Sequence, residues 1–109
     1  MSTAQGAADR RRLEMFRTLG AERLTRLNLG WIQLEQGEAE PGLGPELMRE
    51  LHTLKGEAGL LGYSALASLC HQLEDLLRQA LPSGGSDVTT GDRILRGFDL
   101  IAAAMASDD

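Results

Sequence analysis

The amino-acid sequence predicts an all-α fold, an antiparallel up-and-down bundle of four helices. The chain has 109 residues, enough for one domain and too few for two. Hydrophobic residues make up 42% of it and aromatic residues only 4%, which favours helices packed through aliphatic side chains over a β-sandwich. Apolar residues recur at helical spacing in four stretches, and breaks rich in glycine and proline or serine separate them.

The first helix is expected from about Asp9 to Gln36. Asp9 suits the N-cap position, where a carboxylate accepts a hydrogen bond from a free backbone N–H. Gly20 lies on the same stripe as the apolar residues of this helix. Those residues are Leu13, Phe16, Leu24, Leu27, Trp31 and Leu34. Gly20 and Gly30 each cost a helix up to about 1 kcal/mol relative to alanine, which packing against three other helices can offset.

The second helix follows a loop at residues 37–44, which is rich in glycine and proline. Pro45 suits the first turn of a helix, where no N–H is needed. Gly62 and Tyr63 are expected to break this helix. Its buried stripe is expected to contain Leu47, Leu51, Leu54, Ala58 and Leu61.

The third helix is expected to begin with Ser64 as its cap and to end near Ala80. Its apolar face is expected to contain Leu66, Leu69, Cys70, Leu73, Leu76, Leu77 and Ala80. His71 and Glu74 are expected to lie off this leucine stripe. A loop at residues 81–87 then leads to the last helix.

The fourth helix is expected from about Val88 to Ala106. Its inward residues are expected to be Ile94, Leu95, Phe98, Ile101 and Met105. The bundle would then span residues 9–106, with flexible ends at residues 1–8 and 107–109. Short connections between amphipathic helices imply antiparallel neighbours.

Composition limits the classes of function and the setting. Cys70 is the only cysteine, so no internal disulfide forms, and we expect a reduced, cytoplasmic setting. No apolar run is long enough for a membrane helix, and the N-terminus has no secretory pattern. A net charge of −5 argues against nucleic acid as a partner; Arg10, Arg11 and Arg12 are expected to form a solvated helix start, with a partner contact as the lesser alternative. We expect a monomeric domain.

The candidate chemistry centres on the segment LHTLKGEAGLLGY, residues 51–63. His52 follows the core residue Leu51, and one residue rotates a helix by about 100°, so the imidazole is expected at or outside the edge of the buried stripe. Lys55 lies one turn later, and Arg49 lies three residues earlier on the same side. Gly56 and Gly59 remove side chains from the neighbouring surface.

His71 and Glu74 of the third helix are expected to meet His52. In an antiparallel hairpin, facing residues are equidistant from the turn. The midpoint of positions 52 and 71 is 61.5, and that of 52 and 74 is 63, both inside the predicted break. These side chains should therefore cluster about ten residues, or roughly 15 Å, from the hairpin tip.

Such a cluster suits a nucleophilic imidazole. A carboxylate that accepts the proton of one ring nitrogen fixes the tautomer and makes the other nitrogen more basic. Lys55 would then stabilise the negative charge of an arriving phosphoryl group. Gly56 and Gly59 would let a bulky partner approach the helix closely.

The motif HTLKGEAGLLG resembles the H-x-x-K-G-x-x-x-x-x-G signature of histidine-containing phosphotransfer domains. The downstream segment HQLEDLL resembles the corresponding segment of the phosphotransfer domain found at the N-terminus of CheA-type chemotaxis kinases. The resemblance covers residues 9–106. It implies that His52 is the phospho-acceptor, that Glu74 holds its Nδ1 proton, and that His71 and Lys55 complete the network. Gly56, Gly59 and Arg49 would contribute to partner docking.

The resemblance also implies a relay with two partners. A histidine kinase catalytic domain, which binds ATP and Mg²⁺, would phosphorylate His52, and an aspartate of a response-regulator receiver domain would take the phosphoryl group. This chain has no ATP-binding motif of its own, so we expect it to be a carrier without autophosphorylation and without a cofactor. Glu57 departs from the family pattern, because small residues are common at that position.

Two alternatives come from other classes of protein. His52, His71 and Glu74 offer ligands suited to zinc, although no fourth ligand is evident because Cys70 faces the core. A non-reactive helical docking module, including a degenerate phosphotransfer domain, is the second alternative. The His52–Glu74 pairing argues against it.

Overall fold

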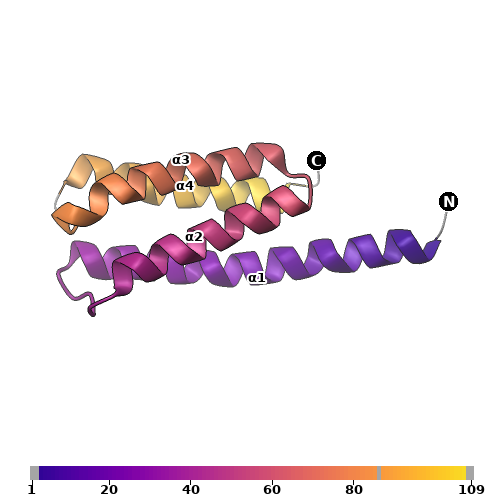
Figure 1. Ribbon diagram of the computed structural model, residues 1–109, viewed down its shortest axis with the longest axis horizontal. Coiled ribbons are helices and arrows are strands. Elements are labelled where there is room, and N and C mark those ends of the chain that lie inside the picture. The colour runs from indigo at the N-terminus through magenta and orange to yellow at the C-terminus, as the bar shows by residue number, and fades with distance from the viewer. Residues whose placement is uncertain (1–2, 86, 108–109) are drawn as a thin grey trace.

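The computed structural model describes residues 3–85 and 87–107. Four helices form an antiparallel bundle: α1 (Thr3–Glu35), α2 (Leu43–Leu60), α3 (Ser64–Ala80) and α4 (Val88–Ala106), with a short 3₁₀ turn, Leu81–Ser83, after α3. α1 packs against α2 and α4, and α3 packs against the same two helices. Figure 1 shows this arrangement, with α1 projecting beyond the others at its N-terminal end. The predicted fold class is confirmed.

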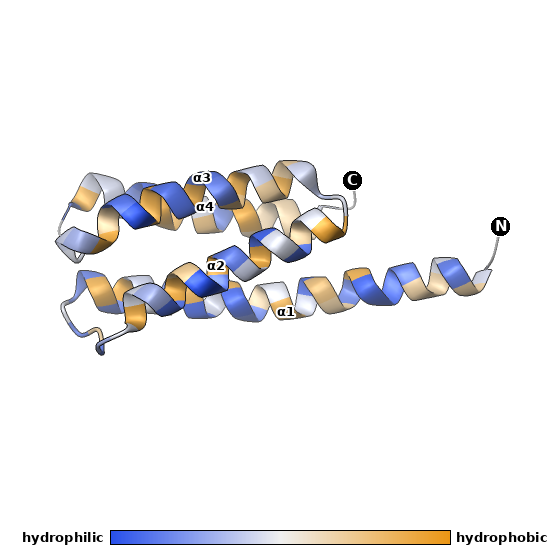
Figure 2. Cartoon of the chain, in the orientation of Figure 1, coloured by the Kyte–Doolittle hydropathy of each residue, from blue (hydrophilic) through white to orange (hydrophobic). Residues whose placement is uncertain are grey.

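The core consists of the helical stripes that the sequence predicts. Figure 2 shows hydrophobic and hydrophilic residues alternating along each helix at helical spacing. The largest fully buried side chains include Trp31, Phe98, Leu27, Leu51 and Leu54. Gly20 and Gly30 are also buried, as a stripe of close helix contacts requires. A few positions at the stripe edges, Leu13, Leu34, Leu69, Leu76 and Leu95, are only partly buried.

The start of α1 differs from the prediction. The helix begins at Thr3, so residues 3–8 are helical, and Asp9 lies inside the helix and not at its N-cap. Asp9 accepts hydrogen bonds from Gln5 Nε2 at 3.1 Å and from Arg12 Nη1 at 2.7 Å. Such pairs at i, i+4 and i, i+3 support a helix that has no partner beside it. Positions 1, 2, 108 and 109 of the predicted flexible ends lie outside the described residues.

The turn between α2 and α3 determines how the two helices face each other. Gly62 has φ +83°, and the Gly62 and Tyr63 N–H groups donate to the carbonyl oxygens of Gly59 and Ala58. This pattern is a Schellman motif, in which a left-handed residue closes the helix end. Two predictions here are wrong: Leu61 is 37% exposed because it lies in the turn, and Tyr63 rather than Ser64 occupies the N-cap of α3.

The other connections are short. Pro45 lies in the first turn of α2, as predicted, although the helix begins two residues earlier. The predicted loop at 81–87 contains the 3₁₀ turn, and Ser86 within it lies outside the described residues. Asp87 caps α4 by accepting hydrogen bonds from Thr89 N and Thr90 Oγ1. No helix in the described part of the chain is long and apolar enough to cross a membrane.

Candidate phosphoryl-acceptor site

His52 lies on the outer side of α2, with buried leucines on either side of it in the sequence. Its side chain is 70% exposed, whereas Leu51 and Leu54 are fully buried. Nδ1 lies 3.3 Å from Glu74 Oε2, which is long for a hydrogen bond. An ionised carboxylate only accepts hydrogen bonds, so the proton of this contact belongs to Nδ1. In the neutral imidazole, this tautomer leaves the lone pair on Nε2.

Glu74 is the buried member of the site. From α3 it contacts His52 of α2, as their equal distances from the turn predict. Its side chain is only 5% exposed. The expectation that Glu74 lies off the leucine stripe is wrong. It lies four residues after Cys70 and three before Leu77, both fully buried, and this spacing could have revealed its burial.

Lys55 compensates the buried charge of Glu74. Its Nζ lies 2.7 Å from Glu74 Oε1, and its side chain is 25% exposed. This contact is an ion pair rather than a directed hydrogen bond, since Oε1 makes no hydrogen bond of good geometry. Burial raises the pKa of Glu74, but the contacts with Lys55 and His52 outweigh burial and hold that pKa below its ordinary value. Glu74 is therefore a carboxylate at neutral pH.

His71 has a different partner from the one expected. Its side chain is 64% exposed, and Nε2 lies 3.9 Å from Asp75 Oδ2. Asp75 also pairs with Arg78 Nη1 at 2.8 Å. Among residues 3–85 and 87–107, no hydrogen bond or ion pair joins His71 to His52 or Glu74. The part of His71 in the network stays a prediction that rests on the resemblance.

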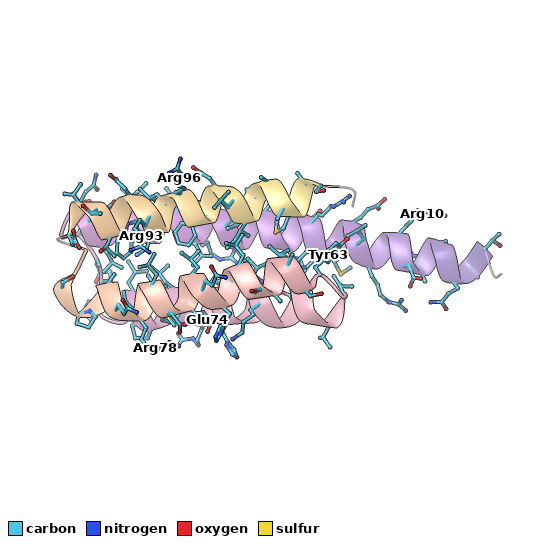
Figure 3. All side chains as sticks on the ribbon, turned by 90° about the horizontal axis from the view of Figure 1, so that it is seen from above. Arg10, Tyr63, Glu74, Arg78, Arg93 and Arg96 are labelled. Atoms are coloured by element: carbon cyan, nitrogen blue, oxygen red, sulfur yellow. The ribbon has the colours of Figure 1, made fainter. Side chains whose placement is uncertain are left out.

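The surface beside His52 is open. A methyl group added at Gly56 or Gly59 would meet no atom within 4 Å. Arg49 is exposed, three residues before His52. Figure 3 shows Glu74 and Arg78 along α3, with Arg93 and Arg96 along α4. The glycines therefore leave space outside α2 that packing within the bundle does not use.

The structure does not favour the zinc alternative. No group of three or more His, Cys, Asp or Glu side chains in the described part of the chain is arranged to hold a metal ion. Cys70 is fully buried, and burial raises the pKa of its thiol to about 11. An enclosed thiol that stays protonated is a poor nucleophile.

The bundle and the site together define a class of protein: an all-helical domain with one solvent-facing histidine oriented by a buried carboxylate. The chain belongs to the Hpt domain family, whose model matches residues 11–106. It is a phosphotransfer domain homologous to the N-terminal part of CheA-like chemotaxis proteins. The resemblance noted in the sequence is thereby confirmed.

The chain is similar to several curated proteins. It is 36% identical over 90 residues to the gliding motility regulatory protein of Myxococcus xanthus, covering 83% of this chain and 12% of that protein. It is 37% identical over 95 residues to the chemotaxis protein CheA of Halobacterium salinarum, covering 85% and 14% of the two chains. For CheA of Bacillus subtilis the identity is 35% over 78 residues, covering 72% and 12%. This chain thus spans a small part of these relatives, and no solved structure matches it with comparable significance.

One ion-pair network, between α1 and α2, was not predicted from the sequence. Arg23 of α1 contacts both Glu50 and Glu57 of α2 at 3.1 Å, and Arg26 contacts Glu50 at 3.0 Å. The hairpin arithmetic could have found it, because the midpoints of these pairs fall near the α1–α2 loop. It also accounts for Glu57, the residue that departs from the family pattern.

Proposed function

We propose that His52 accepts a phosphoryl group from the ATP-binding domain of a histidine kinase and passes it to an aspartate of a response-regulator receiver domain. The observation that carries this proposal is the contact of Nδ1 with the Glu74 carboxylate, on an imidazole that is 70% exposed. It supports a fixed tautomer with Nε2 free to react. The names of the relatives suggest a phosphorelay that controls chemotaxis or gliding motility.

The proposed reaction has two displacements. In the first, the Nε2 lone pair forms a bond to the γ-phosphorus of ATP while the bond to the ADP oxygen breaks. The imidazole ring becomes cationic, and the Glu74 carboxylate at Nδ1 compensates that charge. In the second, an aspartate oxygen of the receiver attacks phosphorus, and the electrons of the N–P bond return to Nε2. Positioning and electrostatics dominate such transfers.

The other site residues support these displacements. Lys55, one turn after His52 on α2, keeps Glu74 ionised in its buried place, and its ammonium would attract phosphoryl oxygens. Gly56 and Gly59 leave room for a protein partner, and Arg49 adds an exposed cation to the same surface. We assign ATP and Mg²⁺ to the kinase domain, and regard this chain as a carrier and substrate, monomeric and cytoplasmic.

Phosphorylation by a kinase core tests the proposal. The chain is incubated with labelled ATP and a CheA-type kinase core that lacks its own Hpt domain, and the modified residue is mapped by mass spectrometry. We expect acid-labile label on His52, its loss in His52→Gln, and its retention in His71→Gln, which removes the other histidine. The chain without the kinase core should remain unlabelled.

Label that persists in His52→Gln would refute the assignment. A chain that folds and binds a receiver but never accepts label would support the docking-module alternative. Circular dichroism and binding of the receiver serve as controls that each variant is folded.

A further inference from the structure

The ion-pair network of α1 and α2 holds two carboxylates at one edge of α2. Arg23 Nη1 lies 3.1 Å from Glu50 Oε2, and Arg23 Nε lies 3.1 Å from Glu57 Oε1. The three side chains are 23%, 17% and 32% exposed, so they are more enclosed than the surface pair of Arg12 and Asp9. Arg26 makes a second contact with Glu50, and the Arg23 and Arg26 contacts outweigh burial and lower the pKa of that carboxyl.

The network lies at the edge of α2 that faces α1, about 80–120° around the helix from the exposed Arg49 and Gly56. Glu50 and Glu57 are seven residues apart and share one side of α2, rotated from His52 by about 140–160°. They are the only carboxylates of α2 between Arg49 and Leu60. Released from Arg23, the flexible Glu57 side chain could turn toward the open surface at Gly56, where a Cβ would meet no atom within 4 Å.

With both carboxylates held, the outer surface of α2 carries no unpaired acid from residue 49 to residue 60. It presents the exposed Arg49 and two bare glycines, on a chain whose net charge is −5. Such a surface complements an acidic partner. A site that accepts a phosphoryl group on a carboxylate and binds Mg²⁺ needs clustered carboxylates, whereas a nucleotide site presents cations and N–H groups to the polyphosphate.

We propose that Arg23 determines partner specificity: by holding Glu57 and Glu50 against α1, it keeps the outer surface of α2 free of negative charge and so favours docking of the acidic receiver domain. This inference rests on the proposed function. Arg23 acts through Glu57 and takes no part in bond making, so it is a positioning residue. Its removal should weaken docking of the receiver and leave the chemistry at His52 unchanged.

Steady-state transfer from the phosphorylated chain to a receiver tests the role of Arg23. We expect Arg23→Gln to raise KM for the receiver about three- to tenfold with kcat unchanged, because a freed carboxylate repels an acidic surface. The increase should shrink as the salt concentration rises. Arg26→Gln is the matched control, since Arg23 still holds Glu50 in that variant, and it should have little effect.

The double variant Arg23→Gln/Glu57→Gln separates charge from structure. If the freed acid causes the defect, this variant restores KM toward the wild-type value, although the α1–α2 ion pair is still missing. A KM that is unchanged in Arg23→Gln, or not restored in the double variant, overturns the inference. Equal slowing of phosphorylation by the kinase core also overturns it, because the surface would then not discriminate. Failure of the proposed function is distinct, since wild-type His52 would then take up no label.

Discussion

Glu74 is the residue on which the site depends. A carboxylate that is 5% exposed would be costly alone, but it has Lys55 at 2.7 Å and His52 at 3.3 Å. Both partners come from α2, one turn apart, so a single acid of α3 contacts the proposed acceptor imidazole and a cation together. The sequence predicted this meeting, because Glu74 and His52 are equidistant from a tight turn, whereas His71, which satisfies the same condition, contacts Asp75 instead.

The burial of Glu74 was not predicted, since a charged residue beside a leucine stripe is ordinarily assigned to solvent. Its spacing from the buried Cys70 and Leu77 on the same helix indicates this burial, and Lys55 and His52 across the hairpin compensate the buried charge. The partner of His71 was not predicted either, although Asp75 lies one turn away on the same helix, with its Oδ2 3.9 Å from His71 Nε2.

We expect Glu74→Gln to lower the free energy of unfolding by about 1–3 kcal/mol near neutral pH, because Lys55 loses the charge that it faces. The folded-state pKa of Glu74 is lowered, so its stabilising contribution is present above the ordinary value of 4.5 and is lost as pH falls through the folded pKa. Urea unfolding of both proteins, at neutral pH and below the folded pKa, measures this.

The difference between wild type and Glu74→Gln should therefore shrink in acid. The pKa of Glu50 is lowered too, but this carboxyl is common to both proteins and cancels in the comparison. A difference that is the same at both pH values would contradict the assigned role of the carboxylate.

At the scale of the helices, glycines have two opposite roles. Gly30 lies where α1 meets α2, and a Cβ there would be 2.5 Å from Leu47 Cδ2, a side chain that is 2% exposed. Gly56 faces open space. The sequence shows both as glycines inside helices, and only the packing of a second helix distinguishes them. Helix existence and core stripes were predictable from spacing, whereas helix ends depended on turn geometry at Gly62 and on side-chain pairs near Asp9.

Alanine substitution should separate the two roles. Gly56→Ala should stabilise the protein by roughly 0.5–1 kcal/mol, because alanine is the better helix former and meets no neighbour. Gly30→Ala should destabilise it by about 1–3 kcal/mol through overpacking against Leu47. Urea unfolding of the pair gives both signs in one experiment, and equal shifts would contradict this explanation.

At the scale of the whole molecule, the four-helix bundle positions the site, while the N-terminal part of α1 projects beyond the bundle. The molecule measures 53 × 23 × 17 Å, and Figure 3 shows Arg10 on the projecting part of α1. The first fully packed side chain of α1 is Phe16, whose ring stacks on Tyr63 with centroids 6.0 Å apart. The architecture followed from four periodic stretches, but the length of this projection did not.

Removal of residues 1–9 should therefore change the melting temperature by no more than about 3 °C, because no buried side chain of the described residues is lost. Phe16→Ala is the contrasting variant and should cost about 3–5 kcal/mol, since it empties a packed position. Thermal circular dichroism compares the two. A large loss on truncation would mean that the projecting turns stabilise the bundle.

The exposure of His52 affects how long a phosphoryl group could stay bound to its imidazole. Under the proposed function, the N–P bond would form on a side chain with no protein wall around it, since 70% of that side chain meets solvent. Enzymes that protect reactive intermediates from hydrolysis do so by enclosing them. The His52 side chain is not enclosed in this way, so under the proposed function water and the receiver would compete for the same bond. The yield of the relay would then depend on transfer being faster than hydrolysis.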